Sequence, residues 1–199
     1  MADEPRLIAV LAAIAAANAE DPHTIEARGE SGPKELLVGR LATEWVQRLD
    51  PSATPEQLVA ARAHHLRRWT RPRTDYPEGR GGYLRWRADA KRAHADEVAE
   101  LVERAGYQSE FADRVGRLIR KEGLGRNAMS DSDPQVQTHE DAICLAFLET
   151  QLDGFAEQVG PDRALDVLAK TASKMSDRAL AEIRSLELTE AGRELISRL

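Results

Sequence analysis

Apolar residues recur every three or four positions along most of this chain, a spacing typical of helices with one buried face. No run of four to eight residues alternates apolar and polar positions as a half-buried strand would. The pattern therefore predicts an all-α protein of eight or nine helices, at about residues 5–20, 33–49, 55–69, 83–105, 109–122, 134–157, 161–175, 176–186 and 189–198.

Polar segments rich in glycine, proline and small residues separate these helices. "EDPHTIEARGESGPK" is predicted to be a polar loop, residues 70–82 hold too much proline and glycine to be regular, and "GLGRNAMSDSD" leads into a helix that begins at Pro134. We expect a single domain, because 199 residues lie at the upper end of the common size for one domain. Its core spans about residues 34–158, with the N-terminal helix 5–20 and the C-terminal helices 161–198 packed on it.

Composition narrows the class of protein. The 199 residues are 42% hydrophobic and 31% charged, as in ordinary globular proteins. The lone cysteine, Cys144, lies in the apolar run "AICLAFLE", so no disulfide can form within one chain and a reducing cytoplasm is the expected location. The run "LIAVLAAIAAA" follows acidic Asp3 and Glu4 and is too short to cross a bilayer. We therefore expect a cytoplasmic protein with no membrane partner.

Positive charge is concentrated in one segment of an otherwise acidic chain. The net charge is −6, but residues 62–92 hold ten lysines and arginines against three acidic residues and carry +7, which leaves −13 for the remainder. The overall acidity argues against sequence-independent binding of nucleic acid, which is possible but not favoured. A local basic field instead attracts a small anion.

Helical spacing places several titratable side chains on apolar faces. His65, His94, Glu140 and Asp141 each lie one turn from apolar residues, on three predicted helices. A buried carboxylate is costly unless it is paired or bound to a metal, so the four either share one polar site or belong to unrelated structural pairs. A shared site would ligate a divalent metal or act as an acid–base pair. His64 points to a different side from His65 and is expected to be exposed.

The irregular segment 70–82 contains arginines suited to binding an anion. Arg73 lies in the loop itself, and Arg80 stands beside a Gly-Gly pair just before a predicted helix start. A glycine pair lets backbone approach a ligand, and the free N–H groups at a helix N-terminus favour anions. A guanidinium binds phosphate oxygens in pairs. The predicted binding set for a phosphorylated ligand is Lys34, Arg67, Arg73, Arg80 and Arg87.

Seven stretches between about residues 14 and 180 carry a family resemblance. They are "GPKELL", "ARAHHLRRW", "RPRTDYPEGRGGYLRWR", "HADEVAEL", "GY", "DPQVQTHEDAICLAFLE" and "KMS". Together they resemble a bacterial and fungal family designated domain of unknown function 4202, some members of which are labelled glutamyl-tRNA synthetases. "SKMSDR" at 173–178 is similar to a signature of class I synthetases, but the chain has no Rossmann pattern and no "HIGH"-type motif.

The order of helices is similar, more distantly, to the HD-domain phosphohydrolase superfamily, whose all-α core holds a divalent metal. "VAARAHHLRRW" stands where that superfamily has a helix ending in adjacent His and Asp, so His64 and His65 align with them. The resemblance implies that the metal ligands are Glu35, His65, His94 and Asp141. At two of these positions the chain departs from the superfamily, with Glu35 in place of His and His65 in place of Asp.

Three functions follow from the charge pattern and the resemblance. The first is an HD-like, metal-dependent hydrolase of a phosphorylated small molecule such as a nucleotide, with His65, His94, Glu140 and Asp141 as catalytic residues and a divalent cation that activates water. The alternative is a non-catalytic helical module that binds an anion, a nucleotide or RNA on the same scaffold. In a third, purely structural interpretation, the arginines pair with acids from the rest of the chain.

Overall fold

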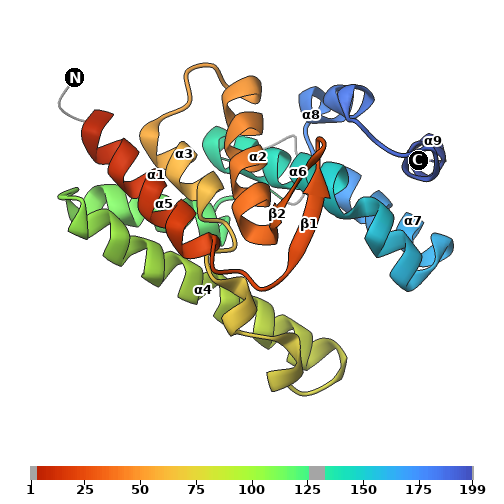
Figure 1. Ribbon diagram of the computed structural model, residues 1–199, viewed down its shortest axis with the longest axis horizontal. Coiled ribbons are helices and arrows are strands. Elements are labelled where there is room, and N and C mark those ends of the chain that lie inside the picture. The colour runs from red at the N-terminus through yellow and green to blue at the C-terminus, as the bar shows by residue number, and fades with distance from the viewer. Residues whose placement is uncertain (1–3, 126–132, 199) are drawn as a thin grey trace.

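Two long helices form the centre of the molecule, and the other elements pack on either side of them (Figure 1). They are α2, Lys34–Leu49, and α6, Pro134–Val159. The structure is a computed structural model that describes residues 4–125 and 133–198. Within these ranges it contains nine α-helices, three short 3-10 helices and one two-stranded hairpin, which confirms a mostly helical single domain.

One hydrophobic cluster lies on the side of the N-terminus. It joins α1 (Glu4–Asn18), α3 (Pro55–Arg62), α4 (Gly79–Arg104) and α5 (Ser109–Arg120). Helix α5 shows why these segments are helical: Val115, Leu118 and Ile119 are spaced three and four apart, and all three are buried. The N-terminal half of the chain thereby builds a core of its own around α3 and α4.

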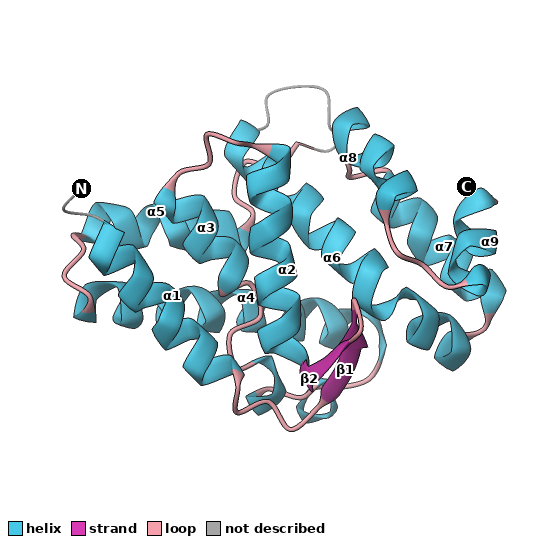
Figure 2. Ribbon diagram, turned by 45° about the horizontal axis from the view of Figure 1, so that its top comes forward, coloured by secondary structure: helices cyan, strands magenta, loops and turns pink. Residues whose placement is uncertain are grey.

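A second hydrophobic cluster lies on the side of the C-terminus, at the opposite end of the molecule (Figure 2). Here α2 and α6 pack with α7 (Pro161–Ala172), α8 (Asp177–Glu182) and α9 (Glu190–Ser197), and a 3-10 turn, η3 (Ile183–Ser185), follows α8. Trp45, Leu145 and Leu168 are almost completely buried in it. No helix among the described residues is long and apolar enough to span a lipid bilayer.

The segment predicted to be a polar loop contains a β-hairpin instead. Strands β1 (Thr24–Ala27) and β2 (Glu30–Pro33) pair antiparallel around a two-residue turn at Arg28 and Gly29, which have φ angles of 51° and 72°. Positive φ at both positions is what a tight hairpin turn requires. Four-residue strands are too short to show an alternating pattern, so the prediction was wrong here.

The third predicted helix is shorter than expected, and the basic segment after it is more regular. Helix α3 ends at Arg62, and the chain then passes through Arg67 in a left-handed conformation, φ 49°. Two 3-10 turns follow, η1 (Arg68–Thr70) and η2 (Arg73–Asp75), and α4 then begins at Gly79 rather than near residue 83. The predicted loop at 123–133 falls largely on residues 126–132, outside the described residues.

The predicted start of the sixth helix is confirmed. Pro134 is the first residue of α6, and the Asp133 carboxylate accepts a hydrogen bond of 3.0 Å from the Gln135 N–H. This is the N-cap arrangement in which an acidic side chain satisfies a free amide of the first turn. The cap fixes the first residue of α6 and thereby the position of Glu140, which lies in this helix.

Candidate functional site

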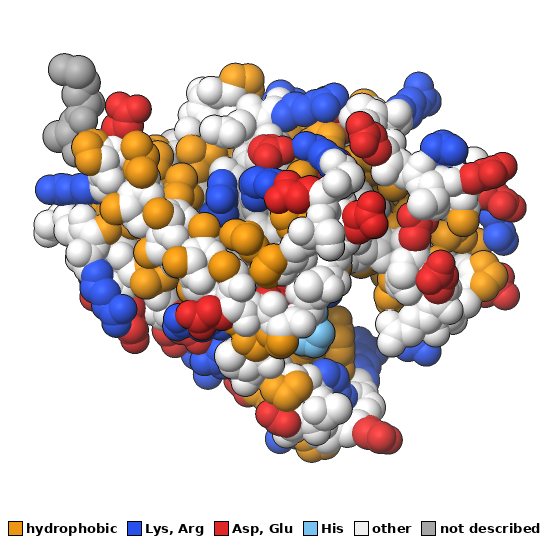
Figure 3. Space-filling view, in the orientation of Figure 1, with side chains coloured by type: hydrophobic (Ala, Val, Ile, Leu, Met, Phe, Trp, Pro, Cys, Tyr) orange, Lys and Arg blue, Asp and Glu red, His pale blue; other side chains and the backbone are white. Residues whose placement is uncertain are grey.

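A cavity of about 360 Å³ lies between the central helices α2 and α6 and helix α4. Its walls come from α2, the segment 64–68, α4, α6 and α7, together with Lys121 and Lys174. On the face shown in Figure 3, the surface is hollowed between the N-terminal part of α4 and α7. A cavity of this size is suited to a small molecule rather than to a protein segment.

Basic side chains outnumber acidic ones three to one around this cavity. Two carboxylates, Glu35 and Glu140, line it. The basic side chains are Lys34, Arg68, Arg87, Lys91, Lys121 and Lys174. With neutral histidines the lining therefore carries four positive charges in excess, inside a protein whose net charge is −6.

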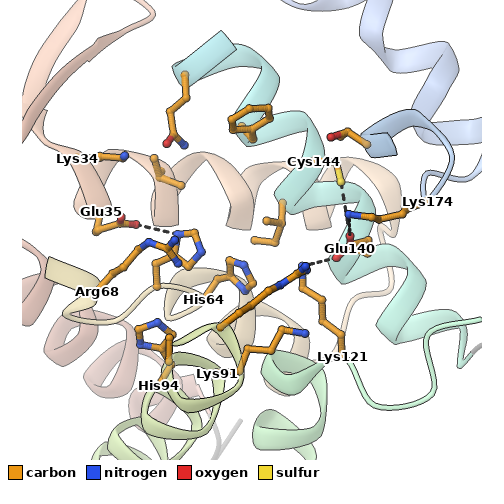
Figure 4. Close-up of a pocket in the computed structure, with 18 of the residues that line it drawn as sticks. Lys34, Glu35, His64, Arg68, Lys91, His94, Lys121, Glu140, Cys144 and Lys174 are labelled. Carbon is orange, nitrogen blue, oxygen red and sulfur yellow. Dashed lines mark hydrogen bonds and ion pairs between the residues drawn. The ribbon is translucent and has the colours of Figure 1, made fainter. Parts of the chain in front are cut away.

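One side of the cavity, the lysine end, is formed by Lys91, Lys121, Lys174 and Glu140 (Figure 4). Glu140 is 3% exposed and pairs directly with Lys121, and the Lys174 Nζ lies 4.0 Å from its second oxygen. Burial alone would raise the pKa of Glu140, but the two lysines outweigh it and hold that pKa at about 2. One fixed carboxylate thus faces several cations.

Lys91 is the cation of the lysine end whose pKa is lowered. Its ammonium donates a hydrogen bond of 3.2 Å to the Arg120 carbonyl oxygen. Burial, reinforced by repulsion from Lys121 and Arg87, lowers the pKa of Lys91 to about 8. An anion bound beside Lys91 would favour its charged form.

The opposite side of the cavity, the histidine end, includes Glu35, His65 and His94. Figure 4 labels Glu35 and His94 on this side. The His65 Nδ1 lies 3.3 Å from the Glu35 carboxylate. Glu35 is fixed in the first turn of α2, where its N–H donates to the Asp21 carboxylate at 3.1 Å. Burial lowers the pKa of His65 although Glu35 acts in the opposite direction, so its imidazole is neutral at physiological pH.

His94 is oriented by a single backbone contact. Its Nδ1 lies 2.8 Å from the Leu66 carbonyl oxygen, and because that oxygen only accepts, we assign the ring proton to Nδ1. The side chain is 2% exposed, and burial lowers its pKa to about 3, so the ring is neutral. Its Nε2 has no hydrogen-bond partner among the described residues.

His64 is buried in the cavity wall, and the expectation that it would be exposed was wrong. It is 8% exposed, and its Nδ1 lies 3.2 Å from the Nε2 of the fully buried His139. The expectation assumed helical spacing up to Trp69, but α3 ends at Arg62. In the turn that follows, His64 and His65 both face the cavity, with their ring centroids 4.3 Å apart.

Asp141 belongs to a structural contact and does not line the cavity. Its carboxylate accepts hydrogen bonds from the Ser176 N–H at 2.9 Å, the Ser176 hydroxyl at 2.6 Å and the Gln137 amide at 2.9 Å. Ser176 is the N-cap of α8, so Asp141 joins α6 to the start of α8. Of the four predicted catalytic residues, the structure brings together His65, His94 and Glu140.

Of the five residues predicted to bind an anion, some line the main cavity and others lie outside it. Lys34 and Arg87 line the cavity, whereas Arg67 and Arg80 are exposed outside it. The Arg73 guanidinium donates to the backbone carbonyls of its own loop, and Arg73 lines a smaller adjoining cavity of about 220 Å³. Most of the basic loop therefore does not reach the main cavity.

The Gly-Gly pair accommodates the protein's own backbone. A Cβ at Gly82 would lie 1.8 Å from the Pro77 carbonyl oxygen, whereas a Cβ at Gly81 would meet nothing within 4 Å. The close approach that the glycines permit is thus made by the basic loop where it returns against α4. The interpretation of this pair as the backbone wall of a ligand site was wrong in that respect.

The divalent cation implied by the HD-domain resemblance was predicted at Glu35, His65, His94 and Asp141. Three of them line the cavity, but Asp141 is committed to Ser176 and Gln137. Over residues 4–125 and 133–198, no group of three or more His, Cys, Asp and Glu side chains is arranged to hold a metal ion. The four predicted ligands are therefore not arranged as a metal site.

Sequence reasoning missed four cations of the cavity: Arg68, Lys91, Lys121 and Lys174. Lys121 follows α5 in a left-handed conformation, φ 59°, which no helical pattern predicts. Cys144 also lines the wall, where burial raises the pKa of its thiol to about 12, so it stays protonated. No local signal marks these positions, because the fold brings them together from separate elements.

Comparison with known proteins places the whole chain in one family. A family model described as Domain of unknown function (DUF4202) matches residues 8–196. No curated protein and no solved structure matches the chain.

Proposed function

Because the chain belongs to the DUF4202 family, whose description names no activity, we propose from the cavity itself that this protein binds a small phosphorylated molecule. The phosphate group occupies the lysine end, beside Lys91, Lys121 and Lys174. This is the binding function that was the alternative to hydrolysis in the sequence analysis.

The observation that carries the proposal is the charge of the cavity lining. Six cations and two carboxylates surround about 360 Å³ in a protein of net charge −6. Holding several like charges together is unfavourable in a partly buried site, and an anion of charge −2 relieves that repulsion. Charge-assisted hydrogen bonds from lysine and arginine to phosphate oxygens are also stronger than neutral ones.

The remaining wall fits the organic part of such a ligand. Tyr83, Trp86 and Phe147 line the cavity, and the Arg68 guanidinium lies 4.7 Å from the centroid of the Trp86 ring. The Trp86 indole N–H is committed to the Arg71 carbonyl oxygen at 2.9 Å, so this ring is held in place. Fixed aromatic surfaces beside a charged end are typical of small-molecule sites.

Calorimetric titration with inorganic pyrophosphate tests the proposal. We expect saturable binding that weakens roughly tenfold in Lys174→Gln and Arg87→Gln, the loss of about one charge-assisted contact. The matched control is Arg85→Gln, since Arg85 lies two residues from Arg87 on α4, is exposed and does not line the cavity. Absence of binding to the unmodified protein, or an equal loss in Arg85→Gln, would refute the proposal.

Hydrolysis of the bound ester is the second candidate function, and the His65–Glu35 pair favours it. In this alternative the phosphoryl group lies at the histidine end, near Lys34 and Arg68, instead of at the lysine end. With Nδ1 held 3.3 Å from Glu35, the His65 Nε2 accepts a proton from a water molecule that attacks phosphorus. A bond forms between the water oxygen and phosphorus, the ester P–O bond breaks, and the protonated His65 gives its new proton to the leaving alkoxide, which departs as the alcohol.

Release of inorganic phosphate from p-nitrophenyl phosphate and from nucleotides measures this activity. His65→Asn is expected to reduce the rate at least about a hundredfold while keeping pyrophosphate affinity. If the unmodified protein releases no phosphate from any of these esters, the hydrolytic function fails and the binding function stands.

A further inference from the structure

The unpartnered nitrogen of His94 indicates what kind of group the ligand presents at the histidine end. The Nδ1–H of His94 is used by the Leu66 carbonyl oxygen at 2.8 Å, so the neutral ring has only a lone pair at Nε2. That atom is fully buried and has no partner in residues 4–125 and 133–198, although the ring lines the cavity. Buried polar atoms are nearly always hydrogen-bonded, so an unpaired acceptor on a ring that borders a cavity calls for a donor.

His65 provides a second acceptor on the same wall. Its Nδ1 faces the Glu35 carboxylate, which only accepts, so the proton of the neutral ring lies between these two groups. The lone pair is then on Nε2, and the His65 ring lies 6.0 Å from the His94 ring, centroid to centroid. Two imidazole acceptors with fixed tautomers therefore stand side by side at the histidine end.

We propose that the ligand is a phosphate ester of a polyhydroxylated molecule, a sugar phosphate or the ribose phosphate part of a nucleotide, whose hydroxyl groups donate to His94 and His65. This inference rests on the proposed function, because the phosphate anchors the ligand at the lysine end. The two ends lie on opposite sides of the cavity (Figure 4), so one molecule has to present an anion at one end and donors at the other. A hydroxyl group is a neutral donor that fits between two neutral imidazoles.

Glu35 and Arg68 restrict what can occupy the histidine end. The Glu35 carboxylate is paired with His65, and its pKa is lowered despite burial, chiefly by His65 and then by Lys34 and Arg68, so the charge of Glu35 is already balanced within this end of the cavity. Arg68 lines the same side with its guanidinium over Trp86, where it can donate to an acceptor oxygen. Hydroxyl groups satisfy both requirements, since they donate to imidazole and accept from guanidinium.

The test compares ligands that share a phosphate and differ in their hydroxyl groups. Dissociation constants are measured by calorimetry for glucose 6-phosphate, ribose 5-phosphate and AMP, and for cyclohexylmethyl phosphate as the ester without hydroxyl groups. We expect the hydroxylated esters to bind roughly 10–100-fold more tightly, since the alkyl ester leaves buried acceptors unpaired. Inorganic phosphate, which reaches the lysine end alone, sets the baseline.

His94→Phe removes the acceptor and keeps a ring in its place. In this variant the hydroxylated esters are expected to lose roughly tenfold or more in affinity and approach the alkyl ester, while binding of inorganic phosphate is unchanged. The comparison of ligands on the unmodified protein does not depend on whether His94→Phe folds. Equal affinity for hydroxylated and alkyl esters would overturn this inference and leave the proposed function intact, whereas no binding of any phosphate would overturn both.

Discussion

At the scale of single residues, the cavity is organised by buried charges that have specific partners. Glu140 is the clearest case, because Lys121 and Lys174 hold its pKa at about 2 against the effect of burial. A carboxyl whose pKa falls on folding stabilises the protein above its unfolded pKa, and that contribution disappears as the pH falls towards the folded pKa. Glu140 therefore contributes to stability as well as to the electrostatics of the lysine end.

We predict that Glu140→Gln lowers the free energy of unfolding by roughly 2–3 kcal/mol at pH 7. The difference from the unmodified protein should shrink below the ordinary Glu pKa of 4.5 and vanish near pH 2, where Glu140 itself is protonated. Urea denaturation at a series of pH values measures both effects. Glu100→Gln is the control, since Glu100 pairs with Arg104 on an exposed face and should cost less than about 0.5 kcal/mol.

For Asp141 we predict a loss of stability without a loss of ligand binding. Asp141→Ala removes the acceptor of the Ser176 N–H and of the Ser176 hydroxyl and leaves the Gln137 amide only the Lys174 carbonyl oxygen, which should cost about 2–4 kcal/mol of stability. Pyrophosphate affinity and metal content should not change. If Asp141→Ala instead keeps its melting temperature and loses bound ligand or metal, Asp141 belongs to the site after all.

At the scale of elements, the basic segment of residues 70–82 folds back against α4 and is held there by specific contacts. Gly82 packs against the Pro77 carbonyl oxygen, Tyr76 donates to Asp89 at 3.3 Å, and Trp86 holds the Arg71 carbonyl oxygen at 2.9 Å. These contacts fix the segment that precedes the aromatic wall of the cavity. The loop is thus a structural support of the site more than a set of ligand contacts.

Substitution of the two adjacent glycines by alanine tests this role. Gly82→Ala should destabilise the protein by about 2 kcal/mol or more, because its Cβ would overlap the Pro77 carbonyl oxygen. Gly81→Ala should stabilise α4 by up to about 1 kcal/mol, since its Cβ meets nothing within 4 Å and alanine favours the helix. Thermal melts of both variants are the measurement, and equal melting temperatures would contradict the packing described.

Helical periodicity was sufficient to predict most elements but not the turns between them. It predicted α2 and α6 closely, because their apolar residues repeat over several turns and Asp133 and Pro134 mark the start of α6. It failed at the hairpin, where four-residue strands show no alternation, and at the end of α3, where Arg67 adopts a left-handed conformation.

Of the candidate site, the sequence predicted the histidine end better than the lysine end. His65 and His94 were recognised because a polar group on an apolar helix face is locally visible. Lys91, Lys121 and Lys174 resemble ordinary exposed lysines, and only tertiary packing brings them around Glu140. Asp141 was misplaced for the same reason, since its partner Ser176 lies 35 residues away.

At the scale of the whole molecule, a basic cavity inside an acidic protein makes binding sensitive to salt. The lining carries four excess positive charges, whereas the chain carries −6. Screening acts over about 10 Å at 0.1 M ionic strength, and it affects both the attraction of a bound anion to the cations of the cavity and its repulsion by the acidic surface. Both effects are weakened by salt, and the close contacts dominate the affinity.

We therefore predict that the dissociation constant for pyrophosphate rises by about three- to tenfold between 50 mM and 500 mM sodium chloride. Calorimetric titrations at four salt concentrations measure the dependence, with sodium gluconate in place of chloride to separate screening from competition by the anion. An affinity that does not change with salt would show that charge is not what holds the ligand.

The most direct test of the central claim is a crystal structure with tungstate, a phosphate analogue whose anomalous signal locates the ion without ambiguity. We predict an anomalous peak at the lysine end of the cavity, within hydrogen-bonding distance of at least two of Lys91, Lys121 and Lys174. A crystal that binds tungstate only at the outer loop, near Arg67, Arg73 or Arg80, or that shows no peak in the cavity, would contradict it.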